Sequence, residues 1–144
     1  PSQRSLPLDE AQRQVRFPLR VPAALGTPDQ VLVADPDSTG AYRVASLLYR
    51  GGALRLEAFD GRADPVYLKR ISAPGTEWVQ VDGAFAVWVA GPHELTYVDR
   101  TGVTRVETAR LAASTLIWEE AGVTYRLEGD LHRAEAIDVA ASLW

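Results

Sequence analysis

The stretch from residue 116 to residue 129 shows the clearest alternation of hydrophobic and polar positions in the chain. With Ala121-Gly122 as a two-residue loop, this stretch predicts a β-hairpin. One face of that hairpin then carries five apolar residues: Leu116, Trp118, Val123, Tyr125 and Leu127. The other face carries Ile117, Glu119, Thr124 and Arg126. We therefore expect a half-buried antiparallel pair, with Trp118 opposite Tyr125 and no catalytic group on it.

Similar short patterns, separated by turn residues, predict further antiparallel strands upstream. They fall at residues 30–34, 42–49, 53–59, 77–81, 84–90, 94–99 and 103–110. Gly51-Gly52 fits a tight hairpin turn because glycine adopts positive φ at little cost. Asp82-Gly83 suits a type I′ turn. Asp64-Pro65 favours a short helix over residues 66–71.

Helical spacing appears only near the two ends of the chain. Leu8, Ala11 and Val15 predict a short helix that begins at Pro7 and ends near Phe17-Pro18. An extended segment over residues 17–22 should then turn Phe17, Leu19 and Val21 inward. A last helix should start with Asp130 as N-cap. Its apolar stripe should consist of Ala134, Ile137, Ala141 and Trp144, widened by Ala140 and Leu143.

These elements predict an α+β fold with one domain. Its antiparallel sheet should contain about eight short strands, with the short N-terminal helix and the C-terminal amphipathic helix packed on it. Residues 1–6 should form a linker and residues 7–144 the domain. At 144 residues the chain is long enough to bury a core without a metal or a disulfide.

Composition excludes several classes of function. The net charge of −4 disfavours nucleic acid and anionic lipid as partners. The absence of Cys removes thiol chemistry and disulfides. No apolar run is long enough to cross a bilayer, so we expect membrane attachment only through an N-terminal tether outside this chain. Because the sequence contains no Met, we also expect it to be part of a longer protein.

Histidine and serine chemistry has little support. His93 follows Gly91-Pro92 and is the one candidate ligand or general base, whereas His132 falls near the start of the last helix. The two histidines do not have the spacing of a zinc site. No serine lies in a Gly-x-Ser-x-Gly elbow. His93 is therefore best interpreted as a hydrogen-bonding loop residue, with a small hydrolase built around it as a remote alternative.

Carboxylates and glycines offer no stronger site. The pairs Asp9-Glu10 and Glu119-Glu120 point apart on a helix or a strand, so they favour a solvated edge over a glycosidase pair. Asp35, Asp37 and Gly40 suggest an oxygen-rich cation loop, although their spacing fails the EF-hand pattern. Gly51-Gly52 lacks the Lys and helix of a phosphate loop. We predict no catalytic, cofactor-binding or metal-binding residue, and no cofactor.

The four tryptophans are the remaining candidates for a binding surface. Trp78, Trp88, Trp118 and Trp144 could line a lipid or glycan groove. Each lies in a periodic apolar pattern, however, which favours a place in the core.

The two ends of the chain resemble the DUF4367-type domain, a bacterial family. The hairpin matches a "W-E-x-x-G-V-T-Y-x-L-x-G" pattern at Trp118, Glu119, Gly122, Val123, Thr124, Tyr125, Leu127 and Gly129, and the last helix matches "A-x-S-L" at Ala140, Ser142 and Leu143. The opening helix is followed by "F-P-x-x-V-P" at Phe17, Pro18, Val21 and Pro22. The segments 88–93 and 110–112 are similar to extracytoplasmic parts of anti-sigma-factor-like proteins.

The resemblance implies a bacterial signalling protein. We expect a non-catalytic extracytoplasmic domain of a membrane-anchored, anti-sigma-factor-like or envelope-stress regulator. It would act by protein binding or by binding an envelope ligand, and the family supplies no catalytic residues to carry over. The alternative is a lipid or hydrophobic-ligand binder, similar to a lipoprotein carrier, whose Trp and Leu residues line a cavity beneath the last helix. Neither the sequence nor the resemblance identifies the partner or the oligomeric state.

Overall fold

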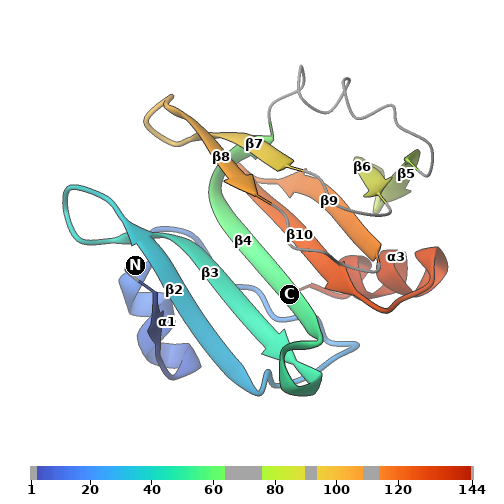
Figure 1. Cartoon of the computed structure of the whole chain (residues 1–144), viewed down its shortest axis with the longest axis horizontal. Helices are drawn as coiled ribbons and strands as arrows, with labels where there is room; N and C mark the ends of the chain where they lie inside the picture. Colours follow the sequence, from blue (N-terminus) through green and yellow to red (C-terminus); the bar gives the residue numbers. More distant parts are fainter. Residues whose placement is uncertain (1–2, 64–75, 90–93, 109–113, 144) are drawn as a thin grey trace.

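The computed structural model describes residues 3–63, 76–89, 94–108 and 114–143. These residues form an antiparallel sheet of ten strands, in the order β1-β2-β3-β4-β10-β9-β6-β5, with β7 beside β4 and β8 beside β7 (Figure 1). The strands are β1 (Arg4–Ser5), β2 (Gln30–Pro36), β3 (Tyr42–Tyr49), β4 (Leu54–Ala63), β5 (Glu77–Val81), β6 (Ala84–Val89), β7 (Glu94–Asp99), β8 (Thr104–Thr108), β9 (Ser114–Glu120) and β10 (Val123–Gly129). The predicted α+β class and antiparallel sheet are confirmed, and the strands number ten rather than eight.

The hairpins have the predicted partners. In the β9–β10 hairpin, Tyr125 lies opposite Trp118, and the loop residues Ala121 and Gly122 both have positive φ. Asp82 and Gly83 also have positive φ and join β5 to β6, as a type I′ turn requires. The β3–β4 connection differs from the prediction, because a short 3-10 turn, η1 (Arg50–Gly52), lengthens the loop.

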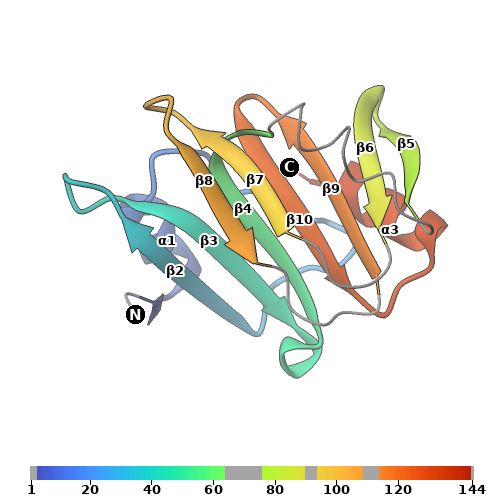
Figure 2. The same cartoon turned by 45° about the horizontal axis from the view of Figure 1, so that its top comes forward.

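Besides its pairing with β3, strand β4 pairs with two further strands in turn, and the change occurs at Gly61. Up to Asp60 it pairs with β10, and from Gly61 it pairs with β7 (Figure 2). A Cβ on Gly61 would stand 2.0 Å from the backbone oxygen of Val98. Only glycine allows the two backbones to approach this closely.

The two helices lie on the same face of the sheet, α1 (Leu8–Gln14) behind β2 and α3 (Arg133–Ala141) behind β6 and β5 (Figures 1 and 2). Residues 4 and 5, which the sequence predicts to be linker, pair with β2 at Val33 and Leu32. The N-cap of α3 is His132 rather than Asp130. No helix within the described residues is long and apolar enough to cross a membrane. The short helix predicted over residues 66–71 lies outside the described residues.

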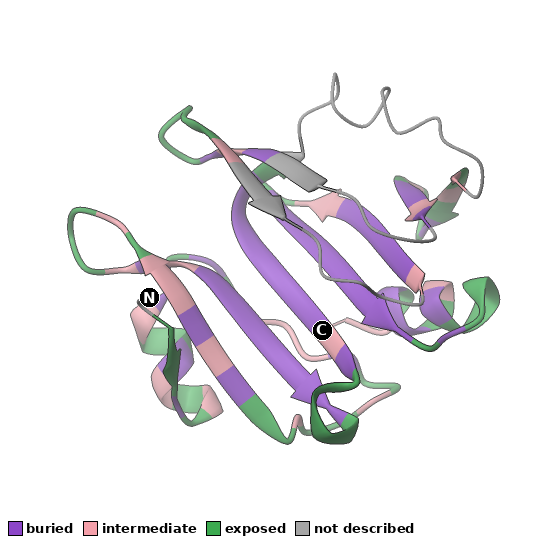
Figure 3. Ribbon diagram, in the orientation of Figure 1, coloured by how far each residue is buried: buried purple, intermediate pink, exposed green. Residues whose placement is uncertain are grey.

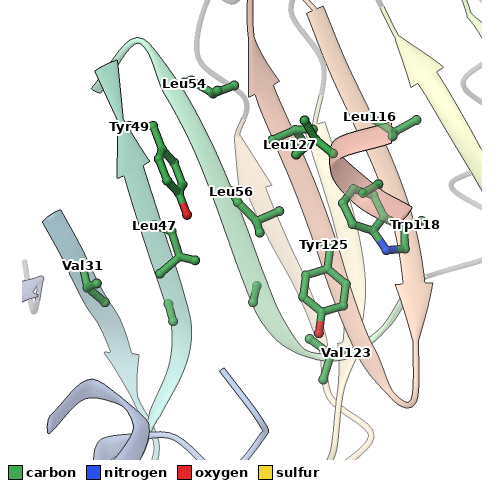
Figure 4. Packing of buried hydrophobic residues seen from close by; sticks show 14 of the residues in the cluster. Val31, Leu47, Tyr49, Leu54, Leu56, Leu116, Trp118, Val123, Tyr125 and Leu127 are labelled. Atoms are coloured by element: carbon green, nitrogen blue, oxygen red, sulfur yellow. The ribbon is translucent and has the colours of Figure 1, made fainter. Parts of the chain in front are cut away.

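The main core fills the space between the sheet and these helices. Figure 4 shows its side chains on one face, where Trp118 stacks on Tyr125 with 5.2 Å between ring centroids. Phe17 is buried in this core, and Leu19 and Val21 pack against it as predicted. The stripe of α3 is displaced from the prediction. Its buried members are Ala136, Val139 and Ala140, whereas Ala134 and Ala141 are exposed.

The opposite face of the sheet is also buried, and here the prediction of a half-buried hairpin is wrong. Every residue of β10 is buried, including Thr124, Arg126 and Glu128 (Figure 3). A second, smaller core on this face consists of Val44, Phe59, Tyr97 and Ile117, and Tyr97 comes from β7. Because β4 carries β7 across this face, residues that look solvent-facing in the sequence become covered.

Candidate functional site

The face of the sheet opposite α1 and α3 carries an unusual number of buried polar side chains, and we call it the polar face. Its buried polar residues are Ser46, Glu57, Thr115, Thr124, Arg126 and Glu128. They come from β3, β4, β9 and β10, which the hairpin register brings side by side. Charged groups are rarely buried unless they are paired, so we expect the buried charges of this face to have specific partners.

A buried ion pair stands at its centre. Arg126 and Glu57 are cross-strand neighbours, and the Arg126 Nε donates to Glu57 Oε1 at 3.0 Å. The two residues are only 1% and 5% exposed. The guanidinium also lies over the ring of Phe59, 5.8 Å from its centroid, which adds a cation–π contact. Arg126 Nη1 has no hydrogen-bond partner among the described residues.

A pocket of about 360 Å³ opens beside this pair, and we call it the face pocket. Glu57 and Ser46 contribute polar groups, and the Ser46 hydroxyl lies 3.5 Å from Glu57 Oε2. The Nε of Arg55, also in the wall, is buried and has no partner within the described part of the chain. The other lining residues are Gln3, Leu32, Ala34, Asp35, Val44, Leu48 and Gly52.

The wall of the face pocket combines aliphatic side chains with polar groups. Ligand sites are typically concave and mostly apolar, with a few polar groups that fix the orientation of the ligand. The face pocket is more polar than this, because, although aliphatic side chains of β2 and β3 lie around the hydroxyl, the carboxylate and the guanidinium, polar groups make up the larger part of its wall. Its volume lies at the lower end of the roughly 300–1,000 Å³ range of ligand sites.

A charged cluster lies near the ends of two hairpins that share a sequence motif. The motif Asp-x-Thr-Gly-x-x-Arg-Val occurs at residues 37–44 and again at residues 99–106. In the first copy the Asp37 carboxylate accepts hydrogen bonds from the Thr39 hydroxyl and from the backbone N–H groups of Thr39 and Ala41. In the second copy the Asp99 carboxylate accepts the equivalent bonds within its own loop. The repeat therefore encodes one loop structure twice.

Both aspartates are held ionised. The Thr39 hydroxyl above all, together with backbone N–H groups and Arg16, lowers the pKa of Asp37 to about 2 against the opposing effect of burial. Burial raises the pKa of Asp99, but hydrogen bonds from Thr101, Arg105 and the loop backbone outweigh it and hold that pKa well below its usual range.

Arginines join the two loops. Arg105 donates to Asp99 at 2.8 Å, and Arg43 lies 3.6 Å from Asp99 and from Asp35. The second motif thus packs against the first through the arginine of each copy. This cluster is not among the sites predicted from the sequence, although the repeated eight-residue motif could have revealed it.

The histidines and acidic pairs do not form a site. His93 lies outside the described residues. His132 is exposed at the start of α3, where its backbone N–H donates to Glu135. Asp9 is exposed in the first turn of α1, and its neighbour Glu10 is half-buried. Glu119 and Glu120 end β9 at the β9–β10 turn, and Glu120 pairs with Arg20 at 2.5 Å.

The structure gives a different role to the loop in which Asp35, Asp37 and Gly40 suggested a cation site. Asp37 uses its oxygens for the loop itself, and Asp35 pairs with Arg43 and Arg105. Within the described ranges, no group of three or more His, Asp or Glu residues is placed to hold a metal ion. The aspartates therefore form a structural, arginine-linked turn.

The tryptophans divide between core and surface. Trp118 is fully buried and Trp88 packs against the core, as predicted. Trp78 is 53% exposed, which corrects the prediction that it lies in the core. It faces away from α3 at the edge of the sheet and contacts the exposed Phe85 edge-to-face, with ring centroids 6.4 Å apart. Trp144 lies outside the described residues.

Comparison of the chain with known protein families, with curated proteins and with solved structures finds no match.

Proposed function

We propose that this chain is a non-catalytic interaction domain that binds its ligand or partner in the face pocket. The observation that carries this proposal is the contrast between the two faces of the sheet. One face packs against both helices through a continuous apolar cluster. The other holds a pocket of about 360 Å³ beside a buried ion pair.

The ion pair supports a binding role because it is an expensive way to fill a core. Apolar residues of the same size often stabilise a protein at least as well as a buried salt bridge. Here the pair instead fixes the Glu57 carboxylate beside the pocket wall, with Arg126 holding Oε1. A side chain held in this way loses little freedom when a ligand binds, which favours specific recognition.

We further propose that the domain belongs to the extracytoplasmic part of a membrane-tethered, anti-sigma-factor-like regulator, in which binding alters the signal relayed through the membrane. This part of the proposal is supported by the resemblance of the hairpin and the last helix to the DUF4367-type domain. It requires a membrane segment or an export signal upstream of Pro1 in the full gene. A gene that encodes neither would refute it.

The lipid-carrier alternative finds less support in the packing. Trp118 stacks on Tyr125, and Ala136, Val139 and Ala140 of α3 belong to the same buried cluster. This arrangement favours a solid core where the alternative places a lipid. A bound lipid would be detected in the pull-down experiment below.

The test is a comparison of three baits in a pull-down from envelope extract, with captured proteins and lipids identified by mass spectrometry. The baits are the wild-type chain, an Ala34→Phe variant that fills the face pocket, and an Ala24→Phe variant. Ala24 is exposed in a loop outside the pocket, so its substitution is the matched control. We expect wild type and A24F to capture the same partner and A34F to lose it.

Each other result has a clear meaning. Capture of the same partner by all three baits would show that binding does not use the face pocket. Capture of a lipid, lost in A34F, would favour the carrier function. If the folded wild-type chain captured no specific protein or lipid, the interaction proposal would be refuted.

A further inference from the structure

A second pocket, of about 300 Å³, lies where the β4–β7 junction meets the β9–β10 turn and the segment after α1, and we call it the end pocket. Three arginines line it, Arg16, Arg62 and Arg100, beside the buried carboxylates of Asp60 and Asp99. It shares no lining residue with the face pocket. Arginine clusters of this kind are a recurrent way of recognising oxyanions, because the guanidinium fork matches their geometry.

Two of these arginines are fixed in place by the protein. Arg100 Nε donates to Asp60 Oδ1 at 2.9 Å, and its Nη2 donates to the backbone oxygen of Arg16 at 3.0 Å. Arg16 Nε donates to Asp37 at 3.2 Å. A guanidinium has five N–H donors, so these contacts orient both groups and leave donors over for a ligand.

Arg62 is the third arginine, and it has no hydrogen bond or ion pair to another described residue. The pocket and its adjoining cluster contain five arginines, Arg16, Arg43, Arg62, Arg100 and Arg105, against the aspartates Asp35, Asp37, Asp60 and Asp99. Within the described residues this region therefore has one excess positive charge, at Arg62, on a chain whose net charge is −4.

We propose that the end pocket binds an oxyanion group, a carboxylate or a phosphate, with Arg62 as its main contact. Arg100 and Arg16 supply additional, pre-oriented donors. The buried side chains of Phe17 and Val123 form part of the wall. They exclude water from one side of the site, which strengthens the attraction between the anion and the guanidinium groups.

The test is a titration of the wild-type chain with inorganic phosphate and, separately, with succinate, at low ionic strength and followed by NMR. The matched variants are Arg62→Gln and Arg50→Gln, because both arginines are exposed but Arg50 lies in the turn before β4, away from the pocket. We expect saturable shifts at the amides of Gly61, Val98 and Gly122. Arg62→Gln should weaken binding about tenfold, as expected for the loss of a charge-assisted hydrogen bond, and Arg50→Gln should leave it unchanged.

The two probes distinguish the two oxyanions, since the tighter one identifies the group that the pocket prefers. Equal weakening in both variants would indicate general charge screening and would overturn the proposal. The absence of saturable shifts at the end pocket with either probe would also overturn it. These outcomes do not depend on the face pocket, whose ligand is tested by the Ala34→Phe comparison.

Discussion

Replacing Arg126 by methionine is the most direct test of the buried ion pair on the polar face. Methionine retains much of the aliphatic stem, so the substitution removes the charge with little change in volume. Glu57 would then keep a buried carboxylate without the guanidinium that donates to its Oε1. Removing one partner of a buried pair typically costs about 3–5 kcal/mol. A domain is stable by only about 5–15 kcal/mol, so the effect should be large.

Urea denaturation, followed by tryptophan fluorescence and by circular dichroism, measures this effect. With a denaturant dependence of about 2 kcal/mol per molar urea, the midpoint should fall by roughly 2 M in Arg126→Met. Trp118 provides the fluorescence signal from the core, where it stacks on Tyr125. Agreement between the two probes would show that the variant still unfolds in one step.

The double variant Glu57→Gln/Arg126→Met is the control. Because its glutamine is neutral, it removes the buried carboxylate that has lost the Arg126 guanidinium and should recover a large part of the lost stability. Wild type, the two single variants and the double variant together form a double-mutant cycle. The proposed coupling of this pair would be refuted by either of two results. One is a decrease in the free energy of unfolding of less than about 1 kcal/mol in Arg126→Met; the other is a destabilisation of the double variant equal to the sum of those of the two single variants.

Three further predictions concern the framework around the two pockets. Gly61→Ala should destabilise the fold by at least about 1–3 kcal/mol, because its Cβ would meet the Val98 backbone oxygen at 2.0 Å. Thermal unfolding measures this loss, and an unchanged melting temperature would contradict the close approach. Asp37, with its pKa lowered to about 2, should contribute stability above pH about 4 that is lost as the pH falls toward 2, and Asp37→Asn should flatten this acid limb of the stability profile. Burial raises the pKa of Tyr125 to about 12, so its contribution should be complete below pH about 10 and disappear as the pH rises through 12; ultraviolet titration of wild type against Tyr125→Phe should show one phenol fewer in that range.

The local elements were largely determined by the sequence, because their signals act over a few residues. Asp82-Gly83 and Ala121-Gly122 each favour a turn with positive φ, and the alternation on either side sets the register. The opposition of Trp118 and Tyr125 follows from that register alone. The antiparallel α+β class could therefore be predicted without knowledge of the tertiary structure.

Burial was the property that local pattern did not determine. Arg126 alternates with apolar residues as a solvent-facing residue does, yet it is 1% exposed. It lies over Phe59, which packs against Tyr97 of β7 on the second face of the sheet. Trp78 gives the opposite case. Its pattern is typical of a core residue, but among the described strands β5 is at the edge of the sheet, and Trp78 is exposed there. The face that a strand buries depends on what the rest of the chain places over it.

Both pockets likewise arise only in the tertiary structure. The end pocket brings together Arg16, Arg62 and Arg100, which lie far apart in the sequence, and Gly61 allows the close pairing of β4 with β7 that places Arg62 opposite Val98. The sequence by itself determined which strands and turns form and how each hairpin pairs. The tertiary structure decided which charges are buried, which are exposed and which converge on a site, because those properties depend on long-range packing rather than on neighbours along the chain.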